Sequence, residues 1–394
     1  MLVPHAIGCL VAGLSFAAAM SAIAADPPRV AAPSTLLHVY VGTYANADAT
    51  GIYHLLFDPD KGTLTAATGA KGVANPSFVA ISPSRKYLYT VAEVDTFAGG
   101  KGGGVAAFAI DQATGNLTKL NEQPTGGGGA CFVSIDPAGK CVMAANYGGG
   151  SFAAFTVNDK GELSPRTAFI QDAGSGPNKG RQEGPHAHSI NPSPDGRFAF
   201  GADLGLDKVN IFKLDADKGT LTPNEPAFAQ VAPGAGPRHF AFHPTAKYAY
   251  VINELVSTVT AFSYDAKQGE LKELQSISTL PADFTGNSTC AEVQVHPSGK
   301  FLYGSNRGHD SLAVFKIDPA TGKLTAAGHQ TAGIKEPRNF RIDPSGRFCL
   351  VANQNGDNVA LFAIDQETGA LKPTGVKVSI PKPVCVKFLQ LGKL

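Results

Sequence analysis

Five side chains of types used in hydrolytic chemistry stand in short polar runs beside apolar segments: His186, His188, Arg238, Glu254 and Arg307. A histidine or a carboxylate can take a proton from water and make it nucleophilic. An arginine can stabilise the negative charge that develops on a carbonyl oxygen under attack. These residues could therefore activate a water molecule and stabilise a developing negative charge, but they are far apart in the chain, so the fold must bring them together.

The chain consists of repeated units, and these units indicate how the residues are positioned. The first half of a unit is an apolar strand, a turn centred on proline and a second strand, as in residues 78–89. A repeat period of about 20 to 50 residues is typical of arrays of equivalent supersecondary units. The turn proline recurs at intervals of 47 to 55 residues, as Pro83, Pro137, Pro192, Pro244, Pro297 and Pro344.

The second half of a unit is a strand that ends in an aromatic residue and is followed by Asp, Gly and Leu, as in residues 108–117. Its glycine occurs seven times, as Gly62, Gly115, Gly161, Gly219, Gly269, Gly322 and Gly369. Two halves give about four strands per unit, because apolar strands alternate with tight turns. The sequence therefore predicts an all-β fold, a seven-bladed β-propeller.

The two ends of the chain predict how the ring closes. Six complete first halves serve seven second halves, and residues 383–391 resemble an inner strand alone. Residues 38–44 resemble the strand that should pair with it. One blade is thus expected to combine both termini, which removes the open sheet edges that invite aggregation. Two stacked all-β domains, the competing interpretation, would not explain this split.

Equivalent positions of the blades should surround one mouth of the ring. Where the residues at these positions differ from blade to blade, they need an explanation other than a structural role in the repeat. Six residues before each turn proline stand Ser77, Cys131, His186, Arg238, Ala291 and Arg338. Seven residues after the Lys or Arg of the same turn stand Glu93, Tyr147, Leu204, Glu254, Arg307 and Gln354, with Tyr44 as the equivalent in the closing blade.

Other polar residues have structural interpretations. The residues before the second series recur in most blades, so we expect them to satisfy turns or backbone groups; they are Asn146, Asp203, Asn253, Asn306 and Asn353. His243 and His296 precede turn prolines at the opposite end and are expected to be structural. Arg238 and Arg307 could also simply bridge neighbouring blades to Glu254 and Glu93.

Composition excludes several classes of protein. The 394 residues include 45 glycines and 27 prolines, and only 16% are charged, which argues against a coiled coil. The 43% of hydrophobic residues argues against disorder. A formal net charge of +1 gives no general reason to bind nucleic acid or an anionic membrane. We expect a monomer or weak dimer whose partner is a small molecule.

The N-terminus predicts export. Residues 6–25 carry no Lys, Arg, Asp or Glu and end in small residues, which is typical of a secretory signal peptide. We assign residues 1–25 to the signal, 26–36 to a spacer and 37–394 to the propeller, and we expect a periplasmic or secreted protein without stable membrane insertion after cleavage. An uncleaved membrane anchor is the alternative.

Metal chemistry has little support in the sequence. His186 and His188 stand two residues apart and could face the same way on a strand, but no third ligand has a readable spacing. Six cysteines form no CxxC or disulfide framework; Cys9 falls in the signal, and most of the other five are expected to be buried. We expect no metal and no other cofactor.

Several long motifs identify a family. They include residues 40–44 (YVGTY), 181–189 (RQEGPHAHS), 236–244 (GPRHFAFHP), 252–258 (INELVST) and 296–311 (HPSGKFLYGSNRGHDS). Over residues 37–391 the sequence resembles the propeller-type lactonases, the 6-phosphogluconolactonase-like proteins that include carboxymuconate-cyclising enzymes. The resemblance implies lactone ring opening or closing in the central cleft. It maps a His, a Glu and two Arg onto His186 (or His188), Glu254, Arg238 and Arg307.

The expected function is hydrolysis of a sugar lactone, and export favours an unphosphorylated aldonolactone. His186 or Glu254 would be the base, Arg238 and Arg307 would stabilise the oxyanion, and Arg338 or one of that pair would hold a carboxylate or phosphate. Further candidates for substrate binding are His188, Gln182, His239, Glu93, Tyr147 and Asp203. The alternatives are a carboxymuconate-type cycloisomerase and a non-catalytic periplasmic propeller that binds a ligand or partner.

Overall fold

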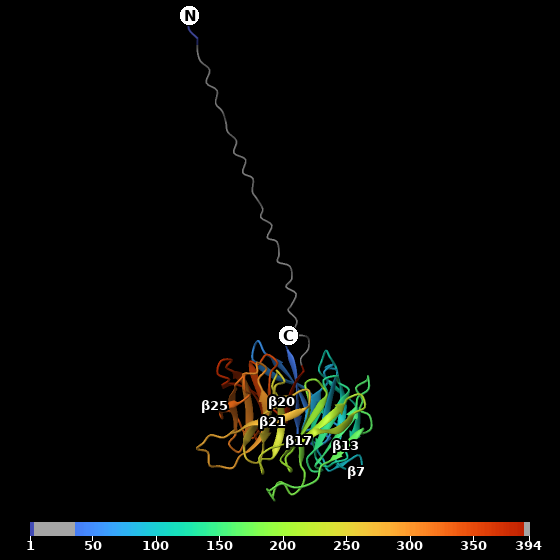
Figure 1. Cartoon of the computed structure of the whole chain (residues 1–394). Helices are drawn as coiled ribbons and strands as arrows, with labels where there is room; N and C mark the ends of the chain where they lie inside the picture. Colours follow the sequence, from blue (N-terminus) through green and yellow to red (C-terminus); the bar gives the residue numbers. More distant parts are fainter. Residues whose placement is uncertain (4–35, 390–394) are drawn as a thin grey trace. The chain divides into compact units, whose positions relative to one another are not determined.

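The structure is a computed structural model that describes residues 1–3 and 36–389. The predicted signal peptide and spacer therefore lie outside the described residues, apart from residues 1–3 and 36. The described chain forms β-strands throughout, with one short 3-10 helix, η1 (Gln354–Gly356), in these ranges (Figure 1). Within them, no helix has the length and apolar character needed to cross a membrane.

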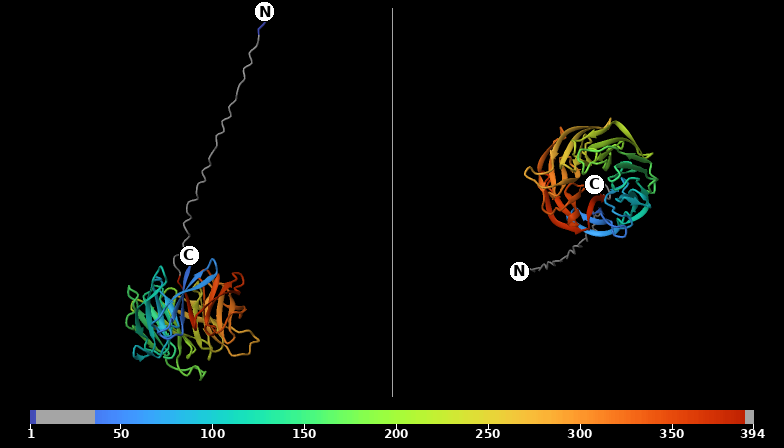
Figure 2. Two further views of the ribbon diagram at one scale, coloured as in Figure 1. Left: turned by 180° about the vertical axis from the view of Figure 1, so that it is seen from behind. Right: turned by 90° about the horizontal axis from the view of Figure 1, so that it is seen from below.

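Seven four-stranded antiparallel sheets form the blades of a propeller, confirming the predicted fold (Figure 2). We number the blades one to six in chain order and call the seventh the closing blade. Their inner strands contact one another in ring order, and the last contacts the first. The inner strands are β4 (Val79–Ile81), β10 (Ala130–Ile135), β14 (Ala187–Pro192), β18 (Pro237–Phe242), β22 (Thr289–Val295), β26 (Pro337–Ile342) and, in the closing blade, β30 (Pro383–Leu389).

The remaining strands follow in the same order outward from the axis. The second strands are β5 (Tyr87–Ala92), β11 (Cys141–Asn146), β15 (Phe198–Asp203), β19 (Tyr248–Asn253), β23 (Phe301–Arg307), β27 (Phe348–Asn353) and β1 (Leu37–Thr43). The third strands are β8 (Gly104–Ile110), β12 (Ser151–Thr156), β16 (Lys208–Asp215), β20 (Thr258–Asp265), β24 (Ser311–Ile317), β28 (Asn358–Ile364) and β2 (Ile52–Asp58). The outer strands are β9 (Leu117–Pro124), β13 (Ala168–Gln171), β17 (Thr220–Gln230), β21 (Glu270–Ser278), β25 (Leu324–Gln330), β29 (Leu371–Ser379) and β3 (Thr63–Ala70). A short hairpin, β6 (Thr96–Phe97) and β7 (Gly100–Lys101), extends the loop of blade one.

The closing blade joins the two ends of the described chain. Its sheet order is β3-β2-β1-β30, so one C-terminal strand completes a sheet of three N-terminal strands. Strand β1 runs antiparallel to β30, with His38 opposite Leu389 and Gly42 opposite Cys385. The predicted closure is confirmed.

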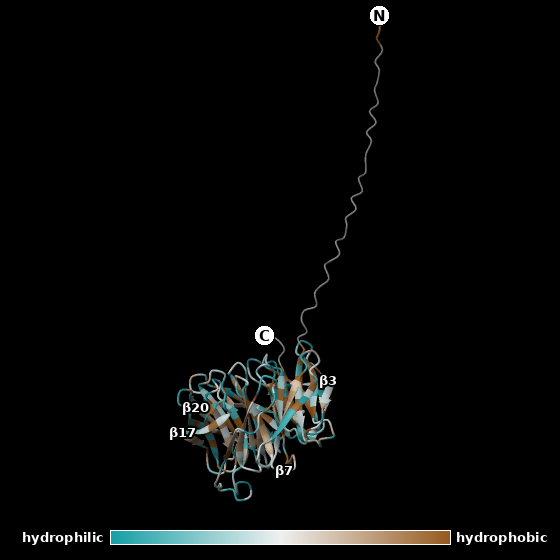
Figure 3. Ribbon diagram, turned by 90° about the vertical axis from the view of Figure 1, so that its right-hand side faces the viewer, coloured by the Kyte–Doolittle hydropathy of each residue, from teal (hydrophilic) through white to brown (hydrophobic). Residues whose placement is uncertain are grey.

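Apolar residues hold the blades together. In Figure 3 hydrophobic residues concentrate in the strands and hydrophilic ones in the connecting loops. The largest side chains of the core are aromatic, and rings such as Phe200 and Phe240 stack between blades three and four with centroids 5.3 Å apart. Such packing uses few charged residues, which accounts for the low charge content of the sequence.

The repeated glycines also have a structural role. Four buried tyrosines of second strands donate their hydroxyl hydrogens to the carbonyl oxygen of such a glycine in the next blade. Gly161 has φ of 81°, and a Cβ there would collide with the ring of Tyr87. The tyrosine and glycine pairs are Tyr40 with Gly115 (2.8 Å), Tyr89 with Gly161 (3.2 Å), Tyr250 with Gly322 (2.9 Å) and Tyr303 with Gly369 (2.8 Å).

Two histidines make a second set of contacts between blades. The Nε2 atom of His243 hydrogen bonds with the carbonyl oxygen of Gly299 at 3.0 Å, and that of His296 with the carbonyl oxygen of Gly346 at 2.8 Å. Both rings also bind a hydroxyl of their own turn through Nδ1. Their predicted structural role is confirmed.

The turn of blade three lies two residues later than the sequence analysis predicts. Pro192 is the last residue of β14 and pairs with Ala199. The N–H of Ser193 donates to the carbonyl oxygen of Phe198 at 2.7 Å, and this bond begins the turn. Pro194 is therefore the equivalent of the other turn prolines.

This shift corrects the first mouth series. Residues 191–194 read Asn-Pro-Ser-Pro, and either proline fits the pattern. Proline is tolerated at 192 because an inner strand is an edge strand of its blade. Counted back from Pro194, the residue in the series is His188, and His186 lies in the loop before β14.

Candidate active site

Bulges in the inner strands aim one side chain per blade toward one end of the ring. The register of β10, β14, β18, β22 and β26 shifts near the start of each strand. A bulge leaves one residue unpaired and redirects its side chain. The residues at these bulges include Cys131, His188, Arg238, Ala291 and Arg338, which are five of the six positions of the predicted series, with His188 in place of His186. The sixth, Ser77, lies before β4, and the irregularity of β22 also includes Glu292.

The two series meet around a cavity of about 340 Å³ at this end of the ring. Most predicted residues of the two series that can do chemistry line it, and Arg238 lies beneath it. The lining residues are Glu93, Cys131, Tyr147, Arg181, His188, Glu254, Thr289, Arg307 and Arg338. We call this the mouth cavity.

Glu254 is the centre of an ionic cluster. Its carboxylate is 5% exposed and accepts hydrogen bonds from Arg238 Nε (2.9 Å) and Arg181 Nη2 (2.7 Å), while Arg307 Nη2 is 3.1 Å away. Burial alone would raise the pKa of Glu254, but the charges of Arg307 and Arg238 outweigh it and hold the pKa well below its usual value. Glu254 is therefore ionised and is a weak base.

Arg238 lies deeper than predicted. It is 2% exposed, and its Nη1 donates to the carbonyl oxygen of Ala291 at 2.6 Å and to His239 Nε2 at 3.1 Å. Burial and the nearby charges of Arg338 and Arg307 lower the pKa of Arg238 to about 10, so it stays charged at neutral pH. Its hydrogen bonds are directed to the protein, which makes it a support for Glu254.

Arg181 is a member of the cluster that the predicted series did not include. It comes from the loop between β13 and β14, and its Nη2 also donates to the hydroxyl of Tyr147 at 3.2 Å. Its side chain is 39% exposed. Arg181 lies outside the repeat, so a comparison of blades could not find it, although it begins the motif of residues 181–189.

Tyr147 separates the two candidate histidines. The ring of His186 stacks on Tyr147 with centroids 4.6 Å apart, whereas His188 meets the same ring edge-on at 5.3 Å. The Nδ1 of His186 donates to the backbone oxygen of Tyr147 at 3.0 Å. The two histidines therefore do not form the metal pair considered from their spacing, and only His188 lines the mouth cavity.

His188 is neutral in this environment. It is 5% exposed, and burial together with the charge of Arg238 lowers its pKa well below the usual value. Its Nδ1 lies 3.7 Å from the sulfur of Cys131. No hydrogen bond joins its Nε2 to any of the described residues, so this nitrogen can accept a proton.

Glu93 and Arg338 form the opposite wall. Glu93 accepts hydrogen bonds from the hydroxyls of Ser77 and Tyr44, the latter at 3.1 Å, and burial raises its pKa. Arg338 makes no hydrogen bond or ion pair within residues 36–389, and its guanidinium carbon lies 5.5 Å from the centroid of the Tyr44 ring. It is the cation of this wall that can take a ligand.

Two predicted substrate-binding residues lie away from the cavity. Gln182 is fully buried, and its amide nitrogen donates to the backbone oxygen of Leu204 (2.8 Å) and to Asp207 Oδ1 (2.7 Å). Asp203 is also fully buried, and its Oδ1 accepts the backbone N–H of His186 at 2.8 Å. Both hold the loop that carries Arg181 and His186, so their placement is that of supporting residues.

His239 continues the cluster toward the other end of the ring. Its Nε2 accepts from Arg238, and its Nδ1 donates to Glu292 Oε2 at 3.2 Å. A chain of polar contacts thus runs from Glu254 through Arg238 and His239 to Glu292. His239 and Glu292 line a second cavity, of about 520 Å³, and not the mouth.

The comparisons with known proteins agree with this geometry. A family profile described as "Lactonase, 7-bladed beta-propeller" matches residues 38–388. The chain belongs to this lactonase family. The 6-phosphogluconolactonase of Bacillus subtilis (strain 168) is 40% identical to the lactonase described here over 350 residues, which are 89% of this chain and 97% of the relative.

A second relative and a solved structure extend the comparison. A 6-phosphogluconolactonase of Formosa agariphila is 38% identical over 308 residues, covering 77% of the lactonase and 86% of the relative. The structure of a periplasmic gluconolactonase from Pseudomonas aeruginosa superposes with a TM-score of 0.82 at 32% identity, covering 90% of the lactonase and 99% of that chain. The resemblance and the enzyme class, a lactonase-type carboxylic-ester hydrolase, are confirmed at the level of the family.

The five cysteines within residues 36–389 are buried, as predicted. Cys131, Cys141, Cys290, Cys349 and Cys385 are all free thiols. Burial raises the pKa of Cys131 beyond the range in which a thiolate forms at neutral pH, although this residue lines the mouth cavity. Across residues 36–389, no three His, Cys, Asp or Glu side chains are grouped so that they could hold a metal ion.

Proposed function

We propose that this lactonase hydrolyses an unphosphorylated sugar lactone, an aldonolactone, outside the cytoplasm. One observation carries the proposal: the mouth cavity combines a neutral His188, an Arg307 anchored by ionised Glu254, and an Arg338 that forms no ion pair or hydrogen bond within residues 36–389. These are the base, the oxyanion stabiliser and the substrate-binding cation that ester hydrolysis needs.

The reaction would proceed in two steps. His188 Nε2 takes a proton from water while the water oxygen forms a bond to the lactone carbonyl carbon, and Arg307 stabilises the resulting oxyanion. The ring C–O bond of this tetrahedral intermediate then breaks, and the proton on His188 passes to the departing alkoxide oxygen. One water is consumed and a hydroxy acid leaves, with His188 neutral again.

Arg238 and Glu254 support this chemistry without taking a proton. Glu254 binds three guanidinium groups and keeps those of Arg181 and Arg307 at the cavity wall. His188 replaces His186 and Glu254 as the base, because His186 stacks outside the cavity and both carboxylate oxygens of Glu254 are paired with guanidinium groups.

Two arguments favour an unphosphorylated substrate. The guanidiniums of Arg181 and Arg307 are already paired with Glu254, which leaves Arg338 as the unpaired cation of the cavity lining, whereas a phosphate dianion is better met by several free cations. The apolar segment of residues 6–25 predicts export, and a relative at 32% identity is titled a periplasmic gluconolactonase.

A substrate panel tests the proposal. Proton release on hydrolysis is measured at constant pH with glucono-δ-lactone, 6-phosphoglucono-δ-lactone and a carboxymuconolactone. The expected result is a kcat/KM at least about tenfold higher for the unphosphorylated sugar lactone. A higher value for the phosphorylated lactone would refute the substrate assignment, and turnover of the muconolactone alone would favour the cycloisomerase. N-terminal sequencing of protein from the periplasmic fraction tests export, with cleavage near residue 25 expected.

A further inference from the structure

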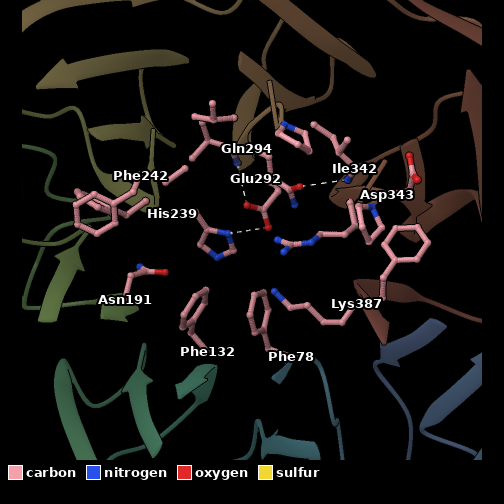
Figure 4. Close-up of a pocket in the computed structure, with 18 residues that line it drawn as sticks. Phe78, Phe132, Asn191, His239, Phe242, Glu292, Gln294, Ile342, Asp343 and Lys387 are labelled. Carbon is pink, nitrogen blue, oxygen red and sulfur yellow. Dashed lines mark hydrogen bonds and ion pairs between the residues drawn. The ribbon is translucent and has the colours of Figure 1, made fainter. Parts of the chain in front are cut away.

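The second cavity lies in the other half of the ring, beyond a layer of buried side chains. His188, Arg238 and His239 belong to this layer, where only about 10 Å³ of free space remains. The second cavity measures about 520 Å³ and is lined by residues of six inner strands, among them Phe132, Asn191 and Glu292, and by Phe78, which precedes β4 (Figure 4). It is therefore separate from the mouth cavity.

Two cations line this cavity side by side, and the structure shows no ion pair for either within residues 36–389. Arg341 of β26 and Lys387 of β30 come from neighbouring inner strands. Within residues 36–389 neither forms an ion pair or a side-chain hydrogen bond. The Lys387 ammonium lies 4.6 Å from the centroid of the Phe78 ring, and Figure 4 shows it beside this ring. Burial lowers the pKa of Lys387, and the charge of Arg341 lowers it further.

The two carboxyl groups of the cavity lining are committed to other partners. Glu292 accepts hydrogen bonds from Asn339 Nδ2, from His239 Nδ1 (3.2 Å) and from its neighbour's backbone N–H (3.0 Å). Asp343 accepts the backbone N–H of Ser345 at 2.9 Å and that of Phe348 at 2.7 Å, which closes its turn. Neither carboxyl forms an ion pair with Arg341 or Lys387 within residues 36–389. Burial raises the pKa of Glu292 to about 7, although the charge of Lys387 opposes this shift, so Glu292 offsets the two cations only in part.

The rest of the lining suits an organic anion. Phe78 and Phe132 stack with centroids 4.2 Å apart and present an apolar wall, while Asn191 supplies an amide. Two like charges at close range repel one another, and an anion between them would remove this repulsion. A lysine and an arginine also provide the donors that a carboxylate accepts most strongly.

We propose that the second cavity is a binding site for a small organic carboxylate, held by Arg341 and Lys387 against the wall of Phe78 and Phe132. The site is distinct from the mouth cavity. This proposal therefore does not depend on the reaction proposed for the mouth cavity.

Calorimetric titration of the mature protein with D-gluconate tests the proposal. Glucitol, which lacks the carboxylate, and inorganic phosphate, which lacks the carbon chain, serve as comparison probes. The expected result is saturable binding of gluconate that weakens at least about tenfold in the double variant Arg341→Gln, Lys387→Gln, because two charge-assisted contacts are lost. Arg338→Gln, which removes a cation of the mouth cavity, distinguishes the two cavities: loss of gluconate binding in this variant and not in the double variant would place gluconate at the mouth and overturn the proposal.

Several results would overturn the proposal. They are the absence of saturable gluconate binding, unchanged binding in the double variant, or equal binding of glucitol. Saturable binding of phosphate without gluconate would also overturn the carboxylate assignment. If the double variant fails to fold, as judged by circular dichroism, Lys387→Met keeps the apolar stem, and the same loss of binding is expected of it.

Discussion

Replacing Asp203 by asparagine should stabilise the protein at alkaline pH without loss of activity. Other blades carry asparagine at this position, and Asn146 Nδ2, for example, donates to the hydroxyl of Ser151 at 3.1 Å. Asp203 has no such donor when ionised, and its buried Oδ2 receives no hydrogen bond. Burial raises the pKa of Asp203, and the neighbouring carboxyl of Asp172 raises it further.

The sign and size of the effect follow from proton linkage. A carboxyl whose pKa is higher in the folded state holds its proton there while the unfolded chain releases it. The free energy of unfolding then falls as pH rises from the ordinary aspartate value to the folded pKa, by about 1.4 kcal/mol per pH unit for one proton. Asparagine does not titrate, so the advantage of Asp203→Asn should grow with pH over this range.

Urea unfolding between pH 5 and pH 9 measures this advantage, with lactone hydrolysis as the second measurement. The variant keeps an oxygen that can accept the N–H of His186, so kcat/KM should stay within about threefold of wild type. The matched control is Asn253→Asp. This variant adds a buried carboxyl, so its free energy of unfolding relative to wild type should fall as pH rises. If the free energies of unfolding of wild type and Asp203→Asn changed in parallel with pH, the reasoning would be refuted. A large loss of kcat/KM would instead indicate that Asp203 takes part in substrate binding, which is the role that the sequence predicts.

Three further predictions concern the histidines and the free arginine. His188→Gln should lower kcat by about 10² to 10⁴ with little change in KM, as expected for loss of a general base, while His186→Gln should change kcat less than about threefold; steady-state kinetics decide between them. Arg338→Gln should raise KM about tenfold or more with a smaller effect on kcat, because a charge-assisted contact with the substrate is lost; an unchanged KM would contradict this role. Burial lowers the pKa of His38 and lowers that of its partner His54 to about 4, so the folded state resists protonation and stability should fall as pH drops from about 6.5 toward 4. Thermal melting of His54→Gln should show a weaker dependence over that range, and an equal dependence would contradict it.

The sequence was sufficient for the fold because the repeat recurs in every blade. Prolines and glycines recur at the turns because the backbone geometry there requires them, even where other side chains vary between blades. The number of blades and the closing blade could therefore be predicted. The single register error arose where Pro192 and Pro194 both fit the pattern. Only the hydrogen bonds of the turn distinguish them, and these do not appear in a sequence.

The candidate site was predictable in part, for a related reason. Glu93, Tyr147, Glu254 and Arg307 were found because they depart from the repeat at a position that the repeat defines. Arg181 comes from a loop with no equivalent in the other blades, so the same comparison could not locate it. The sequence pattern also does not show how deeply a side chain is buried, so the burial of Arg238 beneath the mouth cavity was not predicted.

The last strand of the chain has a consequence for when the protein becomes competent to bind. Strand β30 supplies Lys387 to the second cavity and Val384 to the layer beneath the mouth. A chain still on the ribosome, or one shortened by a stop codon before residue 383, would hold blades one to six and an unclosed seam. Ligand binding in either cavity therefore requires that synthesis has passed β30, because this strand completes the wall.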